Sequence, residues 1–359
     1  MEILSRDRLK RAKKSFATRR VDLGDVRLLM NTPRTPRSGD LVLARVTAIG
    51  SHKSVELETG RKAILFPGDE VILAYGNRYA PDQYEAYVPT GLGPCHMVAA
   101  GGIAANAVAW HDRLSGPTAI EPLGFLCGQD ETPINLADHA LPRIAGPRPA
   151  HVFAVFGTSM NAGKSTLAAS LVKGFSEFGL TVGTAKITGT GAGGDLWMMK
   201  DSGATEALDF TDAGMPSTFE VPLPQIVEGA GNLLRVLRYR GCDVAVVEIA
   251  DGLGQAETAA LARDPVFLSG LSGTFFAAGD AMGAAAGADR LTALGHRICA
   301  VSGAFTRSPL AIREAVSHGL MVATVEELSR PAFAATMVSA PYVGAGSFSP
   351  PSPLAIAAE

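Results

Sequence analysis

The segment FGTSMNAGKST, residues 156–166, ends in a Gly-Lys-Ser triplet typical of loops that bind nucleotide phosphates. It follows the apolar run HVFAVF and precedes the helical pattern GKSTLAASLVKGF, so strand, loop and helix occur in the required order. In such a loop, backbone amides and the positive end of the helix converge on phosphate oxygens. Lys164 is predicted to contact the β- and γ-phosphates, and the Ser165 hydroxyl to bind Mg²⁺. The alternative, an ordinary helix N-terminus, does not explain the ordered strand, loop and helix.

One glycine of this loop lies in an unusual place. The common pattern puts Gly five residues before the Gly-Lys pair, where this chain has Thr158, and Gly157 comes one position earlier. The residues predicted to surround the nucleotide phosphates are Gly157, Thr158, Ser159, Met160, Asn161, Ala162, Gly163, Lys164, Ser165 and Thr166.

Carboxylates follow a second apolar strand, DVAVVEIADG, with Glu248 near its end and Asp251 in the turn. Mg-nucleotide chemistry needs an acidic residue beyond the loop hydroxyl. Glu248 is therefore predicted to bind the metal or a water molecule, and Asp251 to act as a catalytic base or a further ligand. Buried ion pairs are the alternative for these two residues. Asp195, in the glycine-rich run GTGAGGD, is another metal candidate.

Lys186 stands near the carboxyl end of the predicted strand TVGTAKIT, where it is expected to act on the γ-phosphate or to bind an acidic substrate. A lysine on an exposed edge is the alternative. Residues 189–195 contain too many glycines for a core element and are predicted to form a mobile loop facing the ligand. The other substrate candidates are Thr188, Asp209 and Asp212, with Asp280 as a weaker one.

The order of patterns along the chain predicts an α/β fold. From residue 151 to about 325, apolar strands alternate with helices, which is typical of a parallel sheet covered on both faces, with ligands outside the carboxyl ends of the strands. Residues 40–90 instead show short strands separated by Gly, Pro and Asn, which favours a small antiparallel sheet or barrel. We predict a basic segment and linker, a smaller β-rich domain, a P-loop three-layer domain with a mostly parallel sheet, and a tail, at residues 1–38, 39–148, 149–330 and 331–359.

Composition limits the class of protein. The net charge of −3 gives no general attraction to nucleic acid or to anionic membranes. No apolar run reaches the roughly 20 residues that span a bilayer, and the N-terminus lacks a signal-peptide core, so the cytoplasm is the expected location.

Two weaker patterns are set aside. The four cysteines are scattered, and Cys95-His96 with His111 lacks a second close ligand pair, so we expect neither disulfides nor a zinc site. The basic run SRDRLKRAKKSF predicts a helix that ends near Arg19-Arg20, and a solvated helix face explains it better than a nucleic-acid arm.

The loop GTSMNAGKST resembles that of dethiobiotin synthetases, in which the first Gly also lies one residue early. Ser159 stands where the ParA and nitrogenase iron-protein branch carries an extra lysine, so a dimer-driven ATPase switch is not favoured. The stretches TVGTAKIT and WMMKDSGA are similar to the second strand and following helix of the molybdopterin-guanine dinucleotide biosynthesis adaptor. The likeness covers residues 151–325, and it supports Lys186 as a residue facing the phosphates.

The segment VEGAG at 227–231 competes with VEIADG for the place of the Glu-Gly-Ala-Gly turn of dethiobiotin synthetases, from which Ile249 and Asp251 depart. VEGAG also resembles a Glu-Gly-x-Gly-Ser stretch in the domain-of-unknown-function family that contains a D-glutamate N-acetyltransferase. Its flanking apolar residues recur at helical spacing and no apolar strand precedes it. We therefore predict that Glu228 lies on a helix and outside the site.

The last strand and turn, ICAVSGAFTRSPLAI, occupy the place where related folds hold the nucleotide base. The predicted base-pocket residues are Ser302, Gly303, Thr306 and Pro309, with Arg307 reaching a phosphate. A plain helix start at Ser308-Pro309 is the alternative, and both can hold together. The chain lacks the Asn/Thr-Lys-x-Asp signature of GTPases, which favours ATP.

The resemblance implies an enzyme that uses Mg-ATP to phosphorylate a carboxylate or carbamate. The leading hypothesis is a kinase-like or ligase-like enzyme in which Lys164, Lys186 and Asp251 act on a small acidic metabolite held between the two domains. The alternatives are a nucleotide-binding adaptor of cofactor biosynthesis and an N-acyltransferase that grips a phosphorylated cofactor such as a coenzyme A derivative. A homodimer is also expected.

Overall fold

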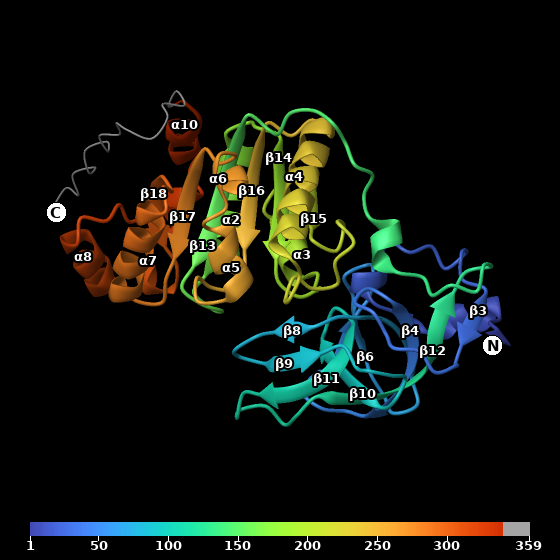
Figure 1. Ribbon diagram of the computed structural model, residues 1–359. Helices are drawn as coiled ribbons and strands as arrows, with labels where there is room; N and C mark the ends of the chain where they lie inside the picture. Colours follow the sequence, from blue (N-terminus) through green and yellow to red (C-terminus); the bar gives the residue numbers. More distant parts are fainter. Residues whose placement is uncertain (340–359) are drawn as a thin grey trace.

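The computed structural model describes residues 1–339 and contains two large sheets, one of six strands and one of ten (Figure 1). The six-stranded sheet lies in the C-terminal part of the chain and the ten-stranded sheet in the N-terminal part. This confirms the predicted α/β fold with a separate β-rich part. Within the described residues, no helix combines the length and the apolar character that a membrane crossing requires.

All strand pairs of the six-stranded sheet are parallel, in the order β15-β14-β16-β13-β17-β18. Its strands are β13 (His151–Gly157), β14 (Val182–Thr188), β15 (Glu206–Asp209), β16 (Val244–Ile249), β17 (Gly273–Ala277) and β18 (Ile298–Ser302). Side chains of β13 alternate between two buried cores, with Ala154 and Phe156 in one and Phe153 and Val155 in the other. A strand buried on both faces explains the continuous apolar run HVFAVF.

Helices cover both faces of this sheet (Figure 1). One core includes side chains of α4 (Leu223–Tyr239), α5 (Ala256–Leu261), α6 (Pro265–Leu268), α7 (Ala281–Ala293) and α8 (Pro309–Ser317). The opposite core includes side chains of α2 (Lys164–Glu177), α3 (Gly194–Asp201), α9 (Val325–Leu328) and α10 (Pro331–Ser339).

Most of the helices and strands predicted for the parallel-sheet part are present, and the segments that differ from the prediction are short. Residues 320–324 do not form a strand, because Val322 makes only an isolated bridge to Val301. The short helices α5 and α6 gave no periodic pattern in the sequence. Glu228 lies on α4, as predicted, and its exposed carboxylate pairs with Arg143 at 2.8 Å.

The N-terminal sheet closes into a barrel through five strands paired in the ring β12-β4-β7-β11-β10-β12. The bounds of its members and of the strands attached to them are β1 (Glu2–Ile3), β2 (Lys13–Lys14), β3 (Leu28–Met30), β4 (Leu41–Ala48), β7 (Glu70–Tyr75), β8 (Arg78–Tyr79), β9 (Tyr84–Tyr87), β10 (Cys95–Ala99), β11 (Ile103–Trp110) and β12 (Thr118–Cys127). A separate hairpin joins β5 (Ser54–Glu56) to β6 (Lys62–Ile64). One pair of the ring, β11 with β7, is parallel, so the barrel is not purely antiparallel.

The basic N-terminal run is not one long helix, which corrects our expectation. Helix α1 covers only Arg6–Arg11; β2 and the 3₁₀ helix η1 (Phe16–Thr18) follow it. Because Ala12 is extended, the helix stops, and β2 pairs with β7 of the barrel. Arg8 donates to Glu70 at 2.8 Å, so this basic side chain pairs with a barrel carboxylate. Strands β1 and β3 also belong to the ten-stranded sheet, so the predicted basic segment is built into it.

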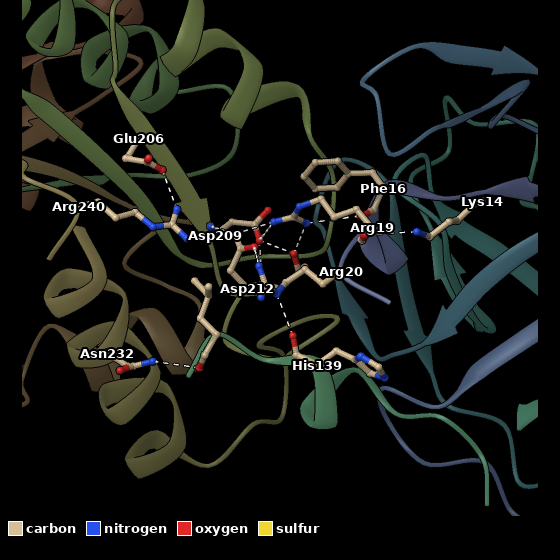
Figure 2. A network of polar contacts seen from close by, with 12 residues as sticks. Lys14, Phe16, Arg19, Arg20, His139, Glu206, Asp209, Asp212, Asn232 and Arg240 are labelled. Atoms are coloured by element: carbon tan, nitrogen blue, oxygen red, sulfur yellow. Dashed lines mark hydrogen bonds and ion pairs between the residues drawn. The ribbon is translucent and has the colours of Figure 1, made fainter. Parts of the chain in front are cut away.

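A buried ion-pair network joins this segment to the parallel sheet (Figure 2). The Arg19 Nη2 atom lies 2.6 Å from Asp212 and 3.2 Å from Asp209, and Arg20 Nη1 lies 3.5 Å from Asp212. The Arg20 Nε atom also donates to the His139 carbonyl at 2.8 Å. Burial, and next the neighbouring Asp209, raise the pKa of Asp212, while Arg19 opposes the rise. The arginines therefore compensate two carboxylates that the fold has removed from water.

We expect Arg19→Met to lower the free energy of unfolding by about 3 kcal/mol or more, because the substitution leaves buried carboxylates with less compensation. Arg240→Met is the matched control. Arg240 pairs with Glu206 at 2.7 Å, but both side chains are about a third exposed, so its loss should cost less than about 1 kcal/mol. Urea unfolding of the two variants measures the difference, and equal costs would contradict the compensating role of Arg19.

Candidate nucleotide-binding site

A cleft of about 440 Å³ opens at the carboxyl ends of the parallel strands. Its lining residues come from the loop after β13, the ends of β14, β16 and β18, the turns after β16 and β18, and the starts of α2, α3 and α9. They are Met160, Asn161, Gly163, Lys164, Ser165, Thr166, Leu167, Lys186, Asp195, Glu248, Ala250, Asp251, Ser302, Gly303, Ala304, Thr306, Arg307 and Val325. This is the edge at which open parallel sheets bind ligands, as the order of elements predicted.

The phosphate-binding loop has a strand, a tight turn and a helix in direct succession. Strand β13 ends at Gly157 and α2 begins at Lys164, while Asn161 and Gly163 adopt positive φ angles of 62° and 98°. A Cβ atom on Gly157 would lie 2.7 Å from the Cγ atom of Lys164. The early glycine therefore leaves room for the lysine side chain to run alongside the strand end. These features make the domain a P-loop domain.

Two neighbouring turns hold the loop from outside. A Cβ on Gly252 would lie 2.2 Å from the Thr158 carbonyl oxygen, and one on Gly303 would lie 2.4 Å from the Ala162 carbonyl oxygen. The Ala304 amide donates to that same Ala162 oxygen at 3.0 Å. Because backbone meets backbone at these places, only glycine fits.

Two lysines supply positive charge to the cleft. Lys164 is 6% exposed, and its Nζ donates to the Ser159 carbonyl at 2.7 Å. Burial lowers the pKa of Lys164, while Glu248 and Asp251 act against the shift. Burial also acts to lower the pKa of Lys186, but Asp195, which forms an ion pair with it, and Glu248 outweigh burial and raise that pKa.

Glu248 is the carboxylate most deeply placed in the cleft. On β16, Glu248 is paired with Val155 of β13 on one side and with Lys186 of β14 on the other. Glu248 is 5% exposed. The Ser165 Oγ donates to its Oε1 atom at 3.1 Å. Its Oε2 atom is buried and has no hydrogen-bond partner within residues 1–339. Burial, followed by the charge of Asp195, raises the pKa of Glu248 to about 7.

The residues present fit Mg²⁺. The ion prefers oxygen ligands and is commonly held by one or two carboxylates together with substrate phosphates and water. Ser165 and Glu248 offer such oxygens side by side, and the unpaired Oε2 atom is a ready ligand. In the part of the chain that is described, no three His, Cys, Asp or Glu side chains gather as a metal cluster, so an all-protein cage is not present.

The carboxylates of Asp195 and Asp251 also line the cleft, and their pKa values are shifted in opposite directions. Asp195 lies in the first turn of α3, and its partner Lys186 lowers its pKa in spite of burial. Burial raises the pKa of Asp251, which Lys186 and Lys164 oppose. Asp195 is thus a charged partner of a lysine, while Asp251 has the perturbed pKa expected of a proton acceptor in a cleft.

Some predicted residues do not line the cleft. The Thr188 hydroxyl is buried and donates to the Ala250 carbonyl, so it is not available to a substrate. Asp209 and Asp212 pair with Arg19, as described above, which corrects their assignment as substrate ligands. Others take ordinary structural places: Pro309 begins α8, Asp280 caps α7, and Gly157, Thr158, Ser159 and Ala162 form the loop behind the lining.

The turn after β18 does contribute to the cleft, through Ser302, Gly303, Thr306 and Arg307. The Ser302 Oγ atom is buried and has no hydrogen-bond partner in the described chain, so it can still bond a ligand. The helix-start reading also holds, because the Ser308 Oγ accepts from the Ala311 amide at 3.3 Å.

Two residues of the barrel reach this region, and the sequence did not single them out. Asp82, in the turn between β8 and β9, accepts a hydrogen bond from the Asn161 side chain at the tip of the loop. The charge of the buried Arg78 acts to lower the pKa of Asp251. Neither lies in a motif, and only the packing of barrel on sheet brings them near.

No protein-family model matches the chain, and no curated protein matches it. Among solved structures it is similar to the signal recognition particle receptor FtsY of Elizabethkingia anophelis, with 16% identity, 50% of this chain and 58% of that chain covered, and a TM-score of 0.37. The 54 kDa signal recognition particle protein of Aeropyrum pernix K1, solved in complex with GDP, gives 18% identity, coverages of 56% and 50%, and a TM-score of 0.36. The chain thus spans 58% and 50% of the lengths of these two proteins. At these scores the likeness decides nothing about activity, and the P-loop assignment rests on the geometry above.

We expect Glu248→Gln to change how stability depends on pH. A carboxyl group whose pKa is higher in the folded state contributes stability that is complete below its unfolded value, here 4.5, and is lost as the pH rises through about 7. As the pH rises from 4.5 to about 8 without added Mg²⁺, the free energy of unfolding of the variant should therefore increase by roughly 1–3 kcal/mol relative to that of the unmodified chain. Denaturant unfolding across this range tests it. Glu228→Gln, on the exposed face of α4, should leave the pH dependence unchanged, and parallel curves for all three proteins would refute the prediction.

Proposed function

We propose that this chain is a Mg-ATP-dependent phosphoryl-transfer enzyme that activates a small acidic metabolite, in the manner of a kinase or ligase. The observation that carries the proposal is the gathering of Lys164, Ser165, Lys186, Glu248 and Asp251 in one cleft at the carboxyl edge of the sheet. A domain that only grips phosphate needs the loop and Lys164. The second lysine and the two carboxylates with raised pKa values are the groups that a transfer reaction requires in addition.

Each side chain has a part in this chemistry. Lys164 and the loop amides hold the β- and γ-phosphates, and Lys186 holds the anionic acceptor next to the γ-phosphate. Asp251 accepts a proton where the acceptor is protonated. Ser165 and Glu248 would hold Mg²⁺, which when bound would supply charge stabilisation on the transferred phosphoryl group.

The reaction breaks the bond between the β-γ bridging oxygen and the γ-phosphorus and forms a bond from that phosphorus to an acceptor oxygen. The products are ADP and a phosphorylated acceptor, such as an acyl phosphate. Lys164, Lys186 and Arg307 line the cleft beside three carboxylates and offer cations that can pair with an acidic acceptor. ATP is proposed as the nucleotide, because the chain has no Asn/Thr-Lys-x-Asp sequence for guanine.

We expect Lys164→Ala to reduce ADP release by at least about 100-fold in a screen of carboxylate and amino-acid acceptors with Mg-ATP, because it removes the cation that stabilises the transferred charge. Lys173→Ala is the matched control. Lys173 lies on the same helix but is 57% exposed and pairs with Glu177, so its loss should leave ADP release unchanged.

Three results would contradict the proposal in distinct ways. Micromolar ATP binding with no ADP release for any acceptor would favour an adaptor. Release with GTP but not with ATP would overturn the nucleotide assignment. Acyl transfer without nucleotide cleavage would favour the acyltransferase. The homodimer expected from the sequence stays a prediction, which the mass of the purified chain in solution tests.

A further inference from the structure

We infer that the hairpin β5–β6 of the barrel is a positioning element for the P-loop domain, and that Glu56 is its positioning residue. Glu56 fixes the start of α3, the helix that places Asp195 against Lys186. The inference rests on the proposed function for its catalytic consequence, while the contact itself can be tested without any activity.

The contact between Glu56 and α3 is direct and buried. Glu56 is 3% exposed, and its Oε2 atom accepts a hydrogen bond from the Gly193 amide at 2.8 Å. Gly193 is the N-cap residue of α3 and has no side chain to cap the helix itself. A carboxylate from the barrel therefore supplies the cap that the helix lacks, at the end where the helix dipole favours negative charge.

Shape restricts this place as strongly as the hydrogen bond. A Cβ on Gly193 would lie 2.6 Å from Glu56 Oε1 and 2.8 Å from the Phe16 ring. Two residues earlier, a Cβ on Gly101 of the barrel would lie 2.1 Å from the Gly191 carbonyl oxygen. Gly191 and Gly193 are thus closely packed against the N-terminal part of the chain, which leaves this part of the glycine-rich run less freedom than its composition predicted.

A second contact holds the same helix one turn later. The Trp197 indole covers Gly60, in the turn between β5 and β6, where a Cβ would lie 2.6 Å from the ring. Its ring also meets Phe16 edge-on, with centroids 6.5 Å apart. Glu56 and Gly60 belong to one hairpin, so that hairpin fixes both the start and the first turn of α3.

The consequence reaches the cleft through Asp195. This residue lies two positions after Gly193, and its carboxylate pairs with Lys186, which is next to Glu248 in the register of the neighbouring strands β14 and β16. If the start of α3 shifts, the ion pair shifts with it, and Lys186 loses the partner that orients its ammonium group. The barrel therefore acts on the acceptor side of the site and leaves the phosphate-binding loop in place.

Hydrogen-deuterium exchange of the full chain tests the contact. In Glu56→Ala, amide exchange of residues 189–195 should speed up by roughly 10-fold or more, because the Gly193 amide loses a charged acceptor. Exchange in α2 should stay as in the unmodified chain. Glu56→Gln keeps an oxygen acceptor and should restore most of the protection. Glu58→Ala is the control, since Glu58 lies in the same hairpin but pairs with Lys14 on the surface.

The same variants test the catalytic consequence with Mg-ATP as the probe. We expect Glu56→Ala to slow single-turnover ADP release about 10-fold in the presence of an acceptor that supports it, and to leave the Kd for Mg-ATP within twofold, with Glu56→Gln recovering most of the rate. Unchanged exchange at 189–195 in Glu56→Ala would overturn the inference, and so would faster exchange in α2 as well, which indicates general loosening. If the unmodified chain does not bind Mg-ATP, the proposed function fails, and the exchange result still decides the positioning role.

Discussion

The site depends on one constraint: charged side chains that are buried in the cleft must be paired with groups of opposite charge. Lys164, Lys186, Asp195, Glu248 and Asp251 all line one cleft, and burial acts against the charged form of each. Carboxylates beside the two lysines oppose the effect of burial on the lysine pKa values, and at Lys186 they outweigh it. One carboxylate, Glu248, has a pKa raised to about 7, which leaves its charge dependent on what else the cleft holds. A cation added beside Glu248 favours its ionised form, and this is how metal binding and protonation become linked at such a site.

The same constraint governs the junction between barrel and parallel sheet. Arg19 and Arg20 compensate Asp209 and Asp212, and Glu56 accepts a hydrogen bond from the buried Gly193 amide at the start of α3. Each of these groups would be costly if it were buried alone, so the two parts of the chain depend on one another for pairing. The barrel contributes in this way to the geometry of the cleft, although the cleft lining comes from residues 160–325.

Local patterns in the sequence were sufficient for much of the fold. Continuous apolar strands such as HVFAVF, alternating with amphipathic helices, predicted the parallel sheet, because burial on both faces leaves a clear mark on composition. The helical spacing around Glu228 correctly excluded VEGAG from the site. The prediction of one helix for the basic N-terminal run was wrong, because tertiary contacts outweigh the local pattern there. Its lysines and arginines suit a helix, but pairing of β2 with β7 and of Arg8 with Glu70 outweighs that local preference.

The sequence predicted the phosphate-binding loop with its lysine and serine, and the carboxylates at the end of β16, because phosphate and metal binding need those groups at set places after a strand. The sequence did not predict which charged side chains pair with one another. Asp209 and Asp212 look like ligands in the sequence, and the fold instead pairs them with arginines some 190 positions away. The roles of Glu56 and Arg78 are likewise invisible in the sequence. Long-range pairing of buried charges depends on which surfaces meet, and that is settled by the packing of the whole chain and by no local pattern.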